Sequence, residues 1–283
     1  EEGNRMKVTV YEVGPRDGLQ SLKQFIPTEI KKGLIDELYK AGLTHIEETS
    51  FAHPKYVPQM ADAEKVFTKG SVLVMNQRGL DRALSTGAEK INIVFSPCEE
   101  FNIKNFGKTR SELITMYYVM LNGIPKDNIR VYISMAFGSP YSGIISPKMM
   151  RLCIKDAKLL GETVVFSDTV GAATKEEVAL WTDIAKENNL KTAIHIHHNG
   201  DEQVAIRTVR YALLEGIREI DSSIGGLGGC PFVQESGANL STETLVRHLN
   251  VWGFDCGITE QKLQPALKIV REIKELQELM LVK

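Results

Sequence analysis

Short apolar runs rich in β-branched residues alternate along the chain with segments of helical periodicity. Residues 8–13 form a run of the first kind, whereas residues 27–41 carry apolar side chains three and four positions apart, with Thr28 as an N-cap. The predicted strands are 7–13, 45–51, 72–76, 90–96, 130–136, 163–168, 192–197 and 218–223. The predicted helices are 27–41, 108–121, 146–160, 174–188 and 201–214.

This alternation predicts an α/β protein, a closed (β/α)8 TIM barrel. A doubly wound open sheet is the main alternative, but it usually has fewer strands and gathers its ligand loops at one switch point. Residues 242–283 show two or three further helical patterns and no clear strand. We expect one domain over residues 1–283, with the barrel at about 7–240 and a C-terminal helical extension, about 241–283, packed on it.

Charge and composition favour a small ligand over a macromolecular one. The 283 residues include 34 basic and 36 acidic side chains, a balance that indicates neither a nucleic acid nor an anionic membrane as partner. No apolar run reaches the roughly 18 residues of a membrane span, and the polar N-terminus is unlike a signal peptide. Four widely spaced cysteines favour reduced thiols, and we expect a cytoplasmic protein.

A candidate metal site combines two histidines with oxygen ligands. His195 and His197 lie two apart on a predicted strand, so both imidazoles face one side, although an isolated pair of this kind is more often structural. Asp17 and Asn239 could add oxygen atoms, and Asn239 could equally be a turn or cap residue. Imidazole, carboxylate and amide ligands suit Mg²⁺ or Mn²⁺ better than zinc.

Other polar residues lie at or near the ends of predicted strands. Arg16 could pair with Asp17 or could stabilise a developing negative charge. Asp168 could be catalytic or could cap a turn. Cys230 lies in the glycine-rich segment 225–231, where a reactive thiol on a lid is at least as plausible as a plain connecting loop.

Glu47 and Glu48 are neighbours on the second predicted strand and therefore face opposite sides of it. Only one of them can point into the barrel. The alternation of residues along the strand barely decides which.

Several motifs together resemble one known family, the hydroxymethylglutaryl-CoA lyases, which are metal-dependent TIM barrels. The resemblance runs from about residue 8 to residue 257, and VGPRDGLQ (13–20) and GLGGCP (226–231) are its most specific segments. The other matching segments are IEETSF (46–51), HPKYVPQMAD (53–62), SPYSGIISP (139–147), SDTVGAAT (167–174), HIH (195–197) and DSSIGGLGGCPF (221–232).

The resemblance implies cleavage of 3-hydroxy-3-methylglutaryl-CoA to acetyl-CoA and acetoacetate. It implies that the ligands of a Mg²⁺ or Mn²⁺ ion are Asp17, His195, His197 and Asn239. It also implies that the substrate is an acyl-CoA and that the protein is a homo-oligomer, a dimer or larger.

The resemblance assigns further roles to single residues. Arg16 would stabilise the enolate of acetyl-CoA, Glu47 and Asp168 would be active-site acids, and Cys230 would be the thiol of a loop that closes over the substrate. Asp17 or a histidine such as His195 would take the proton of the C3 hydroxyl.

Four departures from the family pattern bear on the acyl substrate, and one is Ser139-Pro140 in place of a cysteine-proline. His198 stands where an aspartate is usual, Glu48 stands where a small or apolar residue is usual, and residues 75–78 differ from the usual threonine-proline-asparagine segment. A lyase for another 3-hydroxyacyl-CoA is therefore one alternative. A Claisen-type synthase that joins acetyl-CoA to a 2-oxo acid is a second, and a barrel that binds acyl-CoA or metal without turnover is a third.

Overall fold

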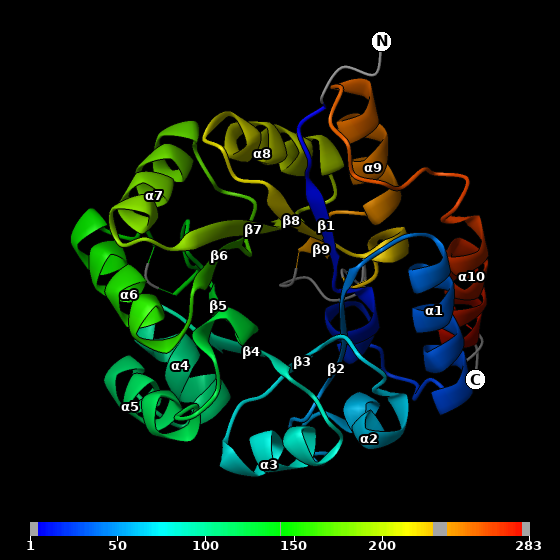
Figure 1. Cartoon of the computed structure of the whole chain (residues 1–283), viewed down its shortest axis with the longest axis horizontal. Helices are drawn as coiled ribbons and strands as arrows, with labels where there is room; N and C mark the ends of the chain where they lie inside the picture. Colours follow the sequence, from blue (N-terminus) through cyan, green and yellow to red (C-terminus); the bar gives the residue numbers. More distant parts are fainter. Residues whose placement is uncertain (1–4, 142, 229–236, 279–283) are drawn as a thin grey trace.

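Parallel strands close into a barrel surrounded by helices (Figure 1). The structure is a computed structural model and describes residues 5–141, 143–228 and 237–278. Neighbouring strands follow the order β6-β5-β4-β3-β2-β1-β8-β7, and the pairing of β6 with β7 closes the ring. The predicted TIM barrel is therefore confirmed, and the open doubly wound sheet is excluded.

Each predicted strand has a counterpart in the barrel. The strands are β1 (Thr9–Glu12), β2 (His45–Ser50), β3 (Ser71–Leu73), β4 (Lys90–Phe95), β5 (Ile129–Ile133), β6 (Thr163–Asp168), β7 (Lys191–His198) and β8 (Glu219–Ser222). A two-residue strand, β9 (Ala238–Asn239), adds to β7 in antiparallel orientation at the end of the barrel.

Helices cover the outside of the barrel. They are α1 (Thr28–Lys40), α2 (Ala63–Val66), α3 (Gln77–Ser85), α4 (Glu99–Phe106), α5 (Arg110–Met120), α6 (Pro147–Leu160), α7 (Lys175–Glu187), α8 (Glu202–Leu214), α9 (Thr242–Val251) and α10 (Gln264–Glu278). Among these residues no helix is long and apolar enough to cross a membrane.

The observed elements differ from the predicted ones in several places, and β5, for example, ends at Ile133 rather than at 136. The third strand ends at Leu73 rather than at 76, because the Asn76 side chain caps α3 by accepting a hydrogen bond from Gly79 N at 2.9 Å. The short helices α2, α3 and α4 escaped prediction. For α4 the segment contains few buried side chains, so its apolar periodicity is weak.

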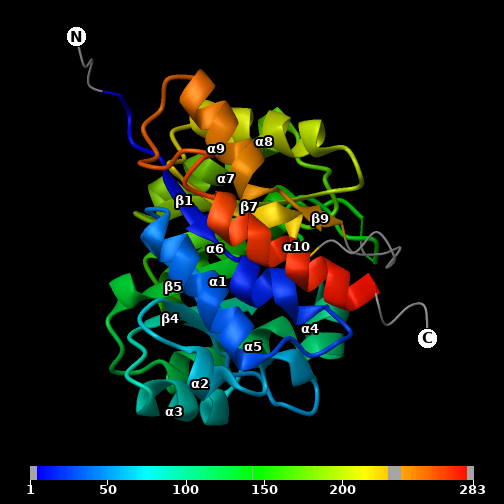
Figure 2. The same cartoon turned by 90° about the vertical axis from the view of Figure 1, so that its right-hand side faces the viewer.

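The C-terminal segment contributes two helices. Figure 1 shows α9 between α8 and α1 in the outer ring, where it follows β8 as a barrel helix would. Figure 2 shows α10 beside α1 on the outer surface, and the two helices contact each other. The amphipathic α10 buries Ala266, Val270 and Ile273 against the rest of the molecule.

The apolar core lies mainly between the strands and the helices. Alternate strand residues such as Val164 and Phe166 face this layer. Inside the barrel, a separate small cluster consists of Tyr132, Val165 and Ala193. Much of the remaining barrel interior is polar, and this polar interior supports the site described below.

A buried carboxylate connects β1 to the end of the chain. Glu12 is fully buried and accepts hydrogen bonds from Gly14 N (2.8 Å), Ile224 N (2.9 Å) and the Thr242 hydroxyl (2.6 Å). Burial is the main cause that raises the pKa of Glu12 to about 7, and the three hydrogen bonds oppose it. One side chain thus fastens β1, the segment after β8 and the start of α9.

We predict that Glu12→Gln removes a pH dependence of stability. The folded protein keeps the Glu12 proton up to about pH 7, whereas an ordinary glutamate loses it near 4.5. The folded state then binds more protons between these values, so the free energy of unfolding falls as pH rises through this window. Between pH 5 and pH 8, the free energy of unfolding of Glu12→Gln relative to that of wild type should rise by up to roughly 3 kcal/mol. Urea unfolding at each pH would measure it.

The amide can replace the carboxyl because Thr242 Oγ1 also lies 2.8 Å from Ser222 Oγ, to which it can donate once it accepts from the new side chain. Glu112→Gln, a change on the exposed start of α5, is the matched control. Parallel pH profiles for wild type and Glu12→Gln would contradict the assignment.

Candidate active site

A tight turn directly after β1 presents Arg16 and Asp17. Val13 O accepts hydrogen bonds from the backbone N of Arg16, Asp17 and Gly18, which makes residues 14–18 a single π-helical turn. A Cβ at Gly18 would lie 2.8 Å from Leu227 Cβ, so the segment after β8 can pack on this turn only because residue 18 is glycine. The glycines of VGPRDGLQ therefore bring two strand ends together.

Arg16 is buried between two carboxylates. Its Nε donates to Glu47 Oε1, and its Nη1 donates to Asp17 Oδ1 at 2.9 Å and to Gln20 Oε1 at 3.3 Å. Burial disfavours the guanidinium, but the charges of Glu47 and Asp17 outweigh burial and raise the pKa of Arg16. Among the described residues Nη2 makes no hydrogen bond, which leaves one donor edge of a fixed cation available.

Two histidines on β7 face Asp17. The rings of His195 and His197 lie 4.9 Å apart, and their Nε2 atoms are separated by 2.9 Å. Asp17 Oδ2 lies 3.8 Å from His195 Nε2 and 3.7 Å from His197 Nε2. Ile196 belongs instead to the core under the helices, so the predicted alternation along this strand is confirmed.

Asp221 on β8 fixes the orientation of His195. Its Oδ2 lies 2.9 Å from His195 Nδ1, so Nδ1 carries the proton and the Nε2 lone pair faces His197 and Asp17. Burial lowers the pKa of His195, but Asp221 outweighs burial and raises it. For His197, burial lowers the pKa and outweighs the opposing contact with Asp17.

Asp17 stays ionised in this setting. Burial favours its protonated form, but the Arg16 charge and the contacts with His197 and His195 hold the pKa of Asp17 well below its usual value. An anionic oxygen and two imidazole nitrogens therefore converge on one point.

These residues fit a divalent metal ion. One ligand atom each from Asp17, His195 and His197 lies within 4.8 Å of the other two. The carboxylate of Asp221 behind His195 is the outer partner that metal-bound histidines usually have. The donor set matches hard or borderline cations, as predicted from the sequence.

Asn239 lies beside this cluster on β9. It pairs with His197 across the antiparallel bridge, and its Nδ2 donates to Asp17 Oδ2 at 2.9 Å and to Leu227 O at 3.0 Å. A Cβ at Gly228 would lie 2.5 Å from Asn239 Nδ2, so the glycine segment also requires this close approach. The structure thus brings Asn239 next to Asp17, and its role as a metal ligand stays a prediction.

Asp168 is held by the backbone of the turn that follows it. Asp168 is buried at the end of β6, where its two oxygens accept from Ala172 N and Ala173 N, both at 2.9 Å. Burial raises the pKa of Asp168, while these backbone hydrogen bonds oppose the shift. Asp168 therefore caps a turn, and its catalytic role stays a prediction. Cys230 lies outside the described residues.

Glu47, not Glu48, points into the barrel. The Glu47 carboxylate contacts Arg16 and accepts from Asn92 Nδ2 at 2.5 Å. Glu48 faces the helices and accepts from Tyr39 Oη (2.6 Å) and from Thr68 N (2.6 Å). The unusual Glu48 is thus a structural side chain that holds the turn before β3.

Sequence reasoning missed the residues that support the ligands from inside the barrel. Asp221 accepts from Tyr132 Oη at 2.8 Å and from Arg130 Nη1 and Nη2 at 2.9 Å each. The Arg130 guanidinium also lies 3.7 Å from the centre of the Tyr11 ring. Their positions within predicted strands could have identified Arg130 and Asp221, because a strand seldom buries a charged residue without a partner.

Comparison with known proteins identifies relatives over nearly the whole chain. The chain is 36% identical over 272 residues to the human mitochondrial hydroxymethylglutaryl-CoA lyase, an alignment that covers 92% of this chain and 83% of the human protein. A crystal structure of the HMG-CoA lyase from Brucella melitensis superposes with a TM-score of 0.86 at 31% identity and covers 95% of this chain and 99% of that one.

A third relative was solved with bound ligands. The structure of an HMG-CoA lyase from Acinetobacter baumannii in complex with coenzyme A and 3-methylmalate has a TM-score of 0.85 at 28% identity and covers 96% of this chain and 92% of that one. The HMGL-like family model matches residues 7–270 of this chain. This match spans all eight barrel strands, α9 and the first part of α10, and the chain therefore belongs to the HMGL-like family.

Proposed function

We propose that the protein is a metal-dependent lyase that cleaves 3-hydroxy-3-methylglutaryl-CoA to acetyl-CoA and acetoacetate. One observation carries the proposal: Arg16, with an open donor edge, lies beside the converging atoms of Asp17, His195 and His197. The relatives named as HMG-CoA lyases support the same substrate, and the complex with coenzyme A supports an acyl-CoA ligand.

The proposed metal is Mg²⁺ or Mn²⁺, held by Asp17, His195, His197 and Asn239. Such an ion would supply Lewis-acid polarisation of the substrate's C3 hydroxyl and would orient the bond to be broken. Asp221 would keep the Nε2 lone pair of His195 available for this purpose.

In the proposed reaction a base removes the proton of the C3 hydroxyl while the C2–C3 bond breaks. Asp17 or His195 is the candidate base, and both face the cluster. The electrons of the broken bond pass to the departing thioester, which becomes an enolate. Arg16, held by Glu47, would meet this charge with Nη2, and Cys230 would protonate the enolate or shield it from water.

Two finer assignments remain part of the proposal. A homo-oligomer in the cytoplasm is expected from the sequence, although the human relative is named as mitochondrial. A lyase for another 3-hydroxyacyl-CoA, a Claisen-type synthase and a barrel without turnover remain the alternatives.

We predict that acetoacetate forms from 3-hydroxy-3-methylglutaryl-CoA when Mg²⁺ or Mn²⁺ is present and that chelator abolishes its formation. The reason is that the C3 hydroxyl is a weak acid without a cation beside it. Product should be measured with each metal and with chelator. If folded protein formed no acetoacetate with either metal, the result would contradict the proposed substrate. Other 3-hydroxyacyl-CoA thioesters and 2-oxo acids would then be tested.

We predict that Asp221→Asn weakens Mn²⁺ binding about 10- to 100-fold in calorimetric titration. The amide would turn an N–H group toward His195 Nδ1, and the ring would then carry its proton on Nε2, the atom that should bind the metal. Tyr132→Phe is the control, because it removes another contact of Asp221 but leaves the one with His195. Equal Mn²⁺ affinity in folded Asp221→Asn and wild type would refute this role.

We predict that Arg16→Lys lowers kcat by roughly 10²- to 10³-fold with little change in KM. A single ammonium group cannot contact Glu47 and Asp17 and also reach an enolate. Steady-state kinetics would measure the effect. Arg110→Lys, which alters an ion pair with Asp156 on the outer helices, should leave kcat unchanged. A drop in kcat that both variants share would indicate a general loss of folding instead.

A further inference from the structure

A second cavity opens at the amino-terminal end of the barrel, away from Arg16 and the histidines. Its volume is about 430 Å³, within the range of small-ligand sites. Its walls come from the first residues of three neighbouring strands, His45 of β2, Ser71 of β3 and Lys90 of β4. The site described above lies at the opposite ends of the strands. The function proposed for that site does not use this cavity.

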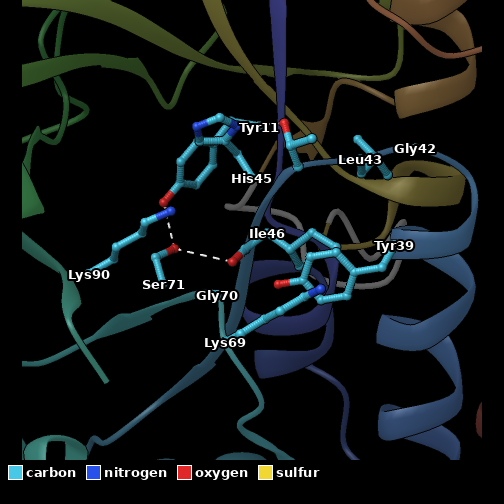
Figure 3. Close-up of a pocket in the computed structure, with 11 residues that line it drawn as sticks. Tyr11, Tyr39, Gly42, Leu43, His45, Ile46, Lys69, Gly70, Ser71 and Lys90 are labelled. Carbon is cyan, nitrogen blue, oxygen red and sulfur yellow. Dashed lines mark hydrogen bonds between the residues drawn. The ribbon is translucent and has the colours of Figure 1, made fainter. Parts of the chain in front are cut away.

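Two lysines give the cavity a positive charge. Figure 3 shows Lys90 extending from the start of β4 and Lys69 from the turn before β3. No carboxylate side chain is among the lining residues. Within the described part of the chain neither lysine forms an ion pair, whereas Lys31 and Lys40, for example, do. The Lys69 ammonium instead lies 4.3 Å from the centre of the Tyr39 ring.

Two carboxylates outside the lining act on residues of the cavity wall. Glu48 accepts from Tyr39 Oη and from Gly70 N at 2.9 Å, and Glu219 pairs with Arg130 at 3.0 Å. Arg130 thus offsets the charge of Glu219, whereas Glu48 accepts from neutral donors and keeps its charge. Burial lowers the pKa of His45, and the charges of Lys90 and Arg130 lower it further against the opposing charge of Glu219. The lining itself contributes two ammonium groups and no carboxylate.

Polar groups form the floor of the cavity. Tyr11 Oη and Ser71 Oγ lie 2.5 Å apart, and both are buried. These hydroxyls are bonded to each other and to Asn92, so the two ammonium groups are the donors left for the oxygens of an anion, and the Tyr39 and His45 rings line the space beside them. We propose that this cavity binds a small oxyanion, the phosphate or carboxylate group of a metabolite-sized molecule, with Lys69 and Lys90 as its cationic contacts.

Calorimetric titration with inorganic phosphate and, separately, with succinate tests the proposal, at ionic strength matched with chloride. Wild type should bind at least one of them saturably with one site per chain, and the probe that binds identifies the head group. Lys69→Gln/Lys90→Gln should weaken that binding at least tenfold. Both lysines are exposed, so the variant should keep its fold, which circular dichroism would verify.

The matched control is Lys126→Gln/Lys191→Gln. Both of its lysines are exposed near the starts of β5 and β7, at the same end of the barrel but outside the cavity. It should bind as wild type does. Binding of neither probe by wild type, or equal affinity in the Lys69/Lys90 variant, would overturn the proposal. Because the titration needs neither metal nor acyl-CoA, its result is independent of the lyase assay.

Discussion

The buried ion pair between Arg16 and Glu47 is the contact on which the rest of the site depends. Arg16 has 8% of its surface exposed and Glu47 has none, so water solvates neither charge well. Loss of one partner from a buried pair typically costs about 3–5 kcal/mol, because the other charge is left uncompensated. The position of the Arg16 guanidinium is therefore set by the barrel interior as well as by its own turn.

This ion pair is one link in a closed series of contacts around the inside of the barrel. The series runs through Tyr11, Ser71, Asn92, Glu47, Arg16, Asp17, His197, His195, Asp221 and Arg130, and the Arg130 guanidinium returns to the Tyr11 ring. A polar interior of this kind is stable only when its members satisfy one another. Three of the four proposed metal ligands, Asp17, His195 and His197, thus each contact neighbours in the series.

The sequence allowed the barrel and most of the site to be predicted, since both rest on local patterns. Alternation along β7 placed His195 and His197 on one face, and VGPRDGLQ placed Arg16 and Asp17 at a strand end. The inward residue of the Glu47–Glu48 pair could not be read from alternation, because both side chains are buried and only their partners distinguish them. Asp221 was missed because its role depends on His195 and Arg130, which lie far away in sequence.

The hydrogen bonds that Glu12 accepts from Gly14, Ile224 and Thr242 have a consequence for biosynthesis. β1 leaves the ribosome before the elements that it contacts. It pairs with β8, Val13 N donates to Ser222 O, and Glu12 accepts a hydrogen bond from Thr242. The nascent chain therefore cannot complete these contacts of its first strand until residue 242 has emerged. Until then one edge of β1 stays unpaired, a state that invites association with other chains. Demand for a chaperone should accordingly be greatest late in translation, when the barrel is almost finished but still open.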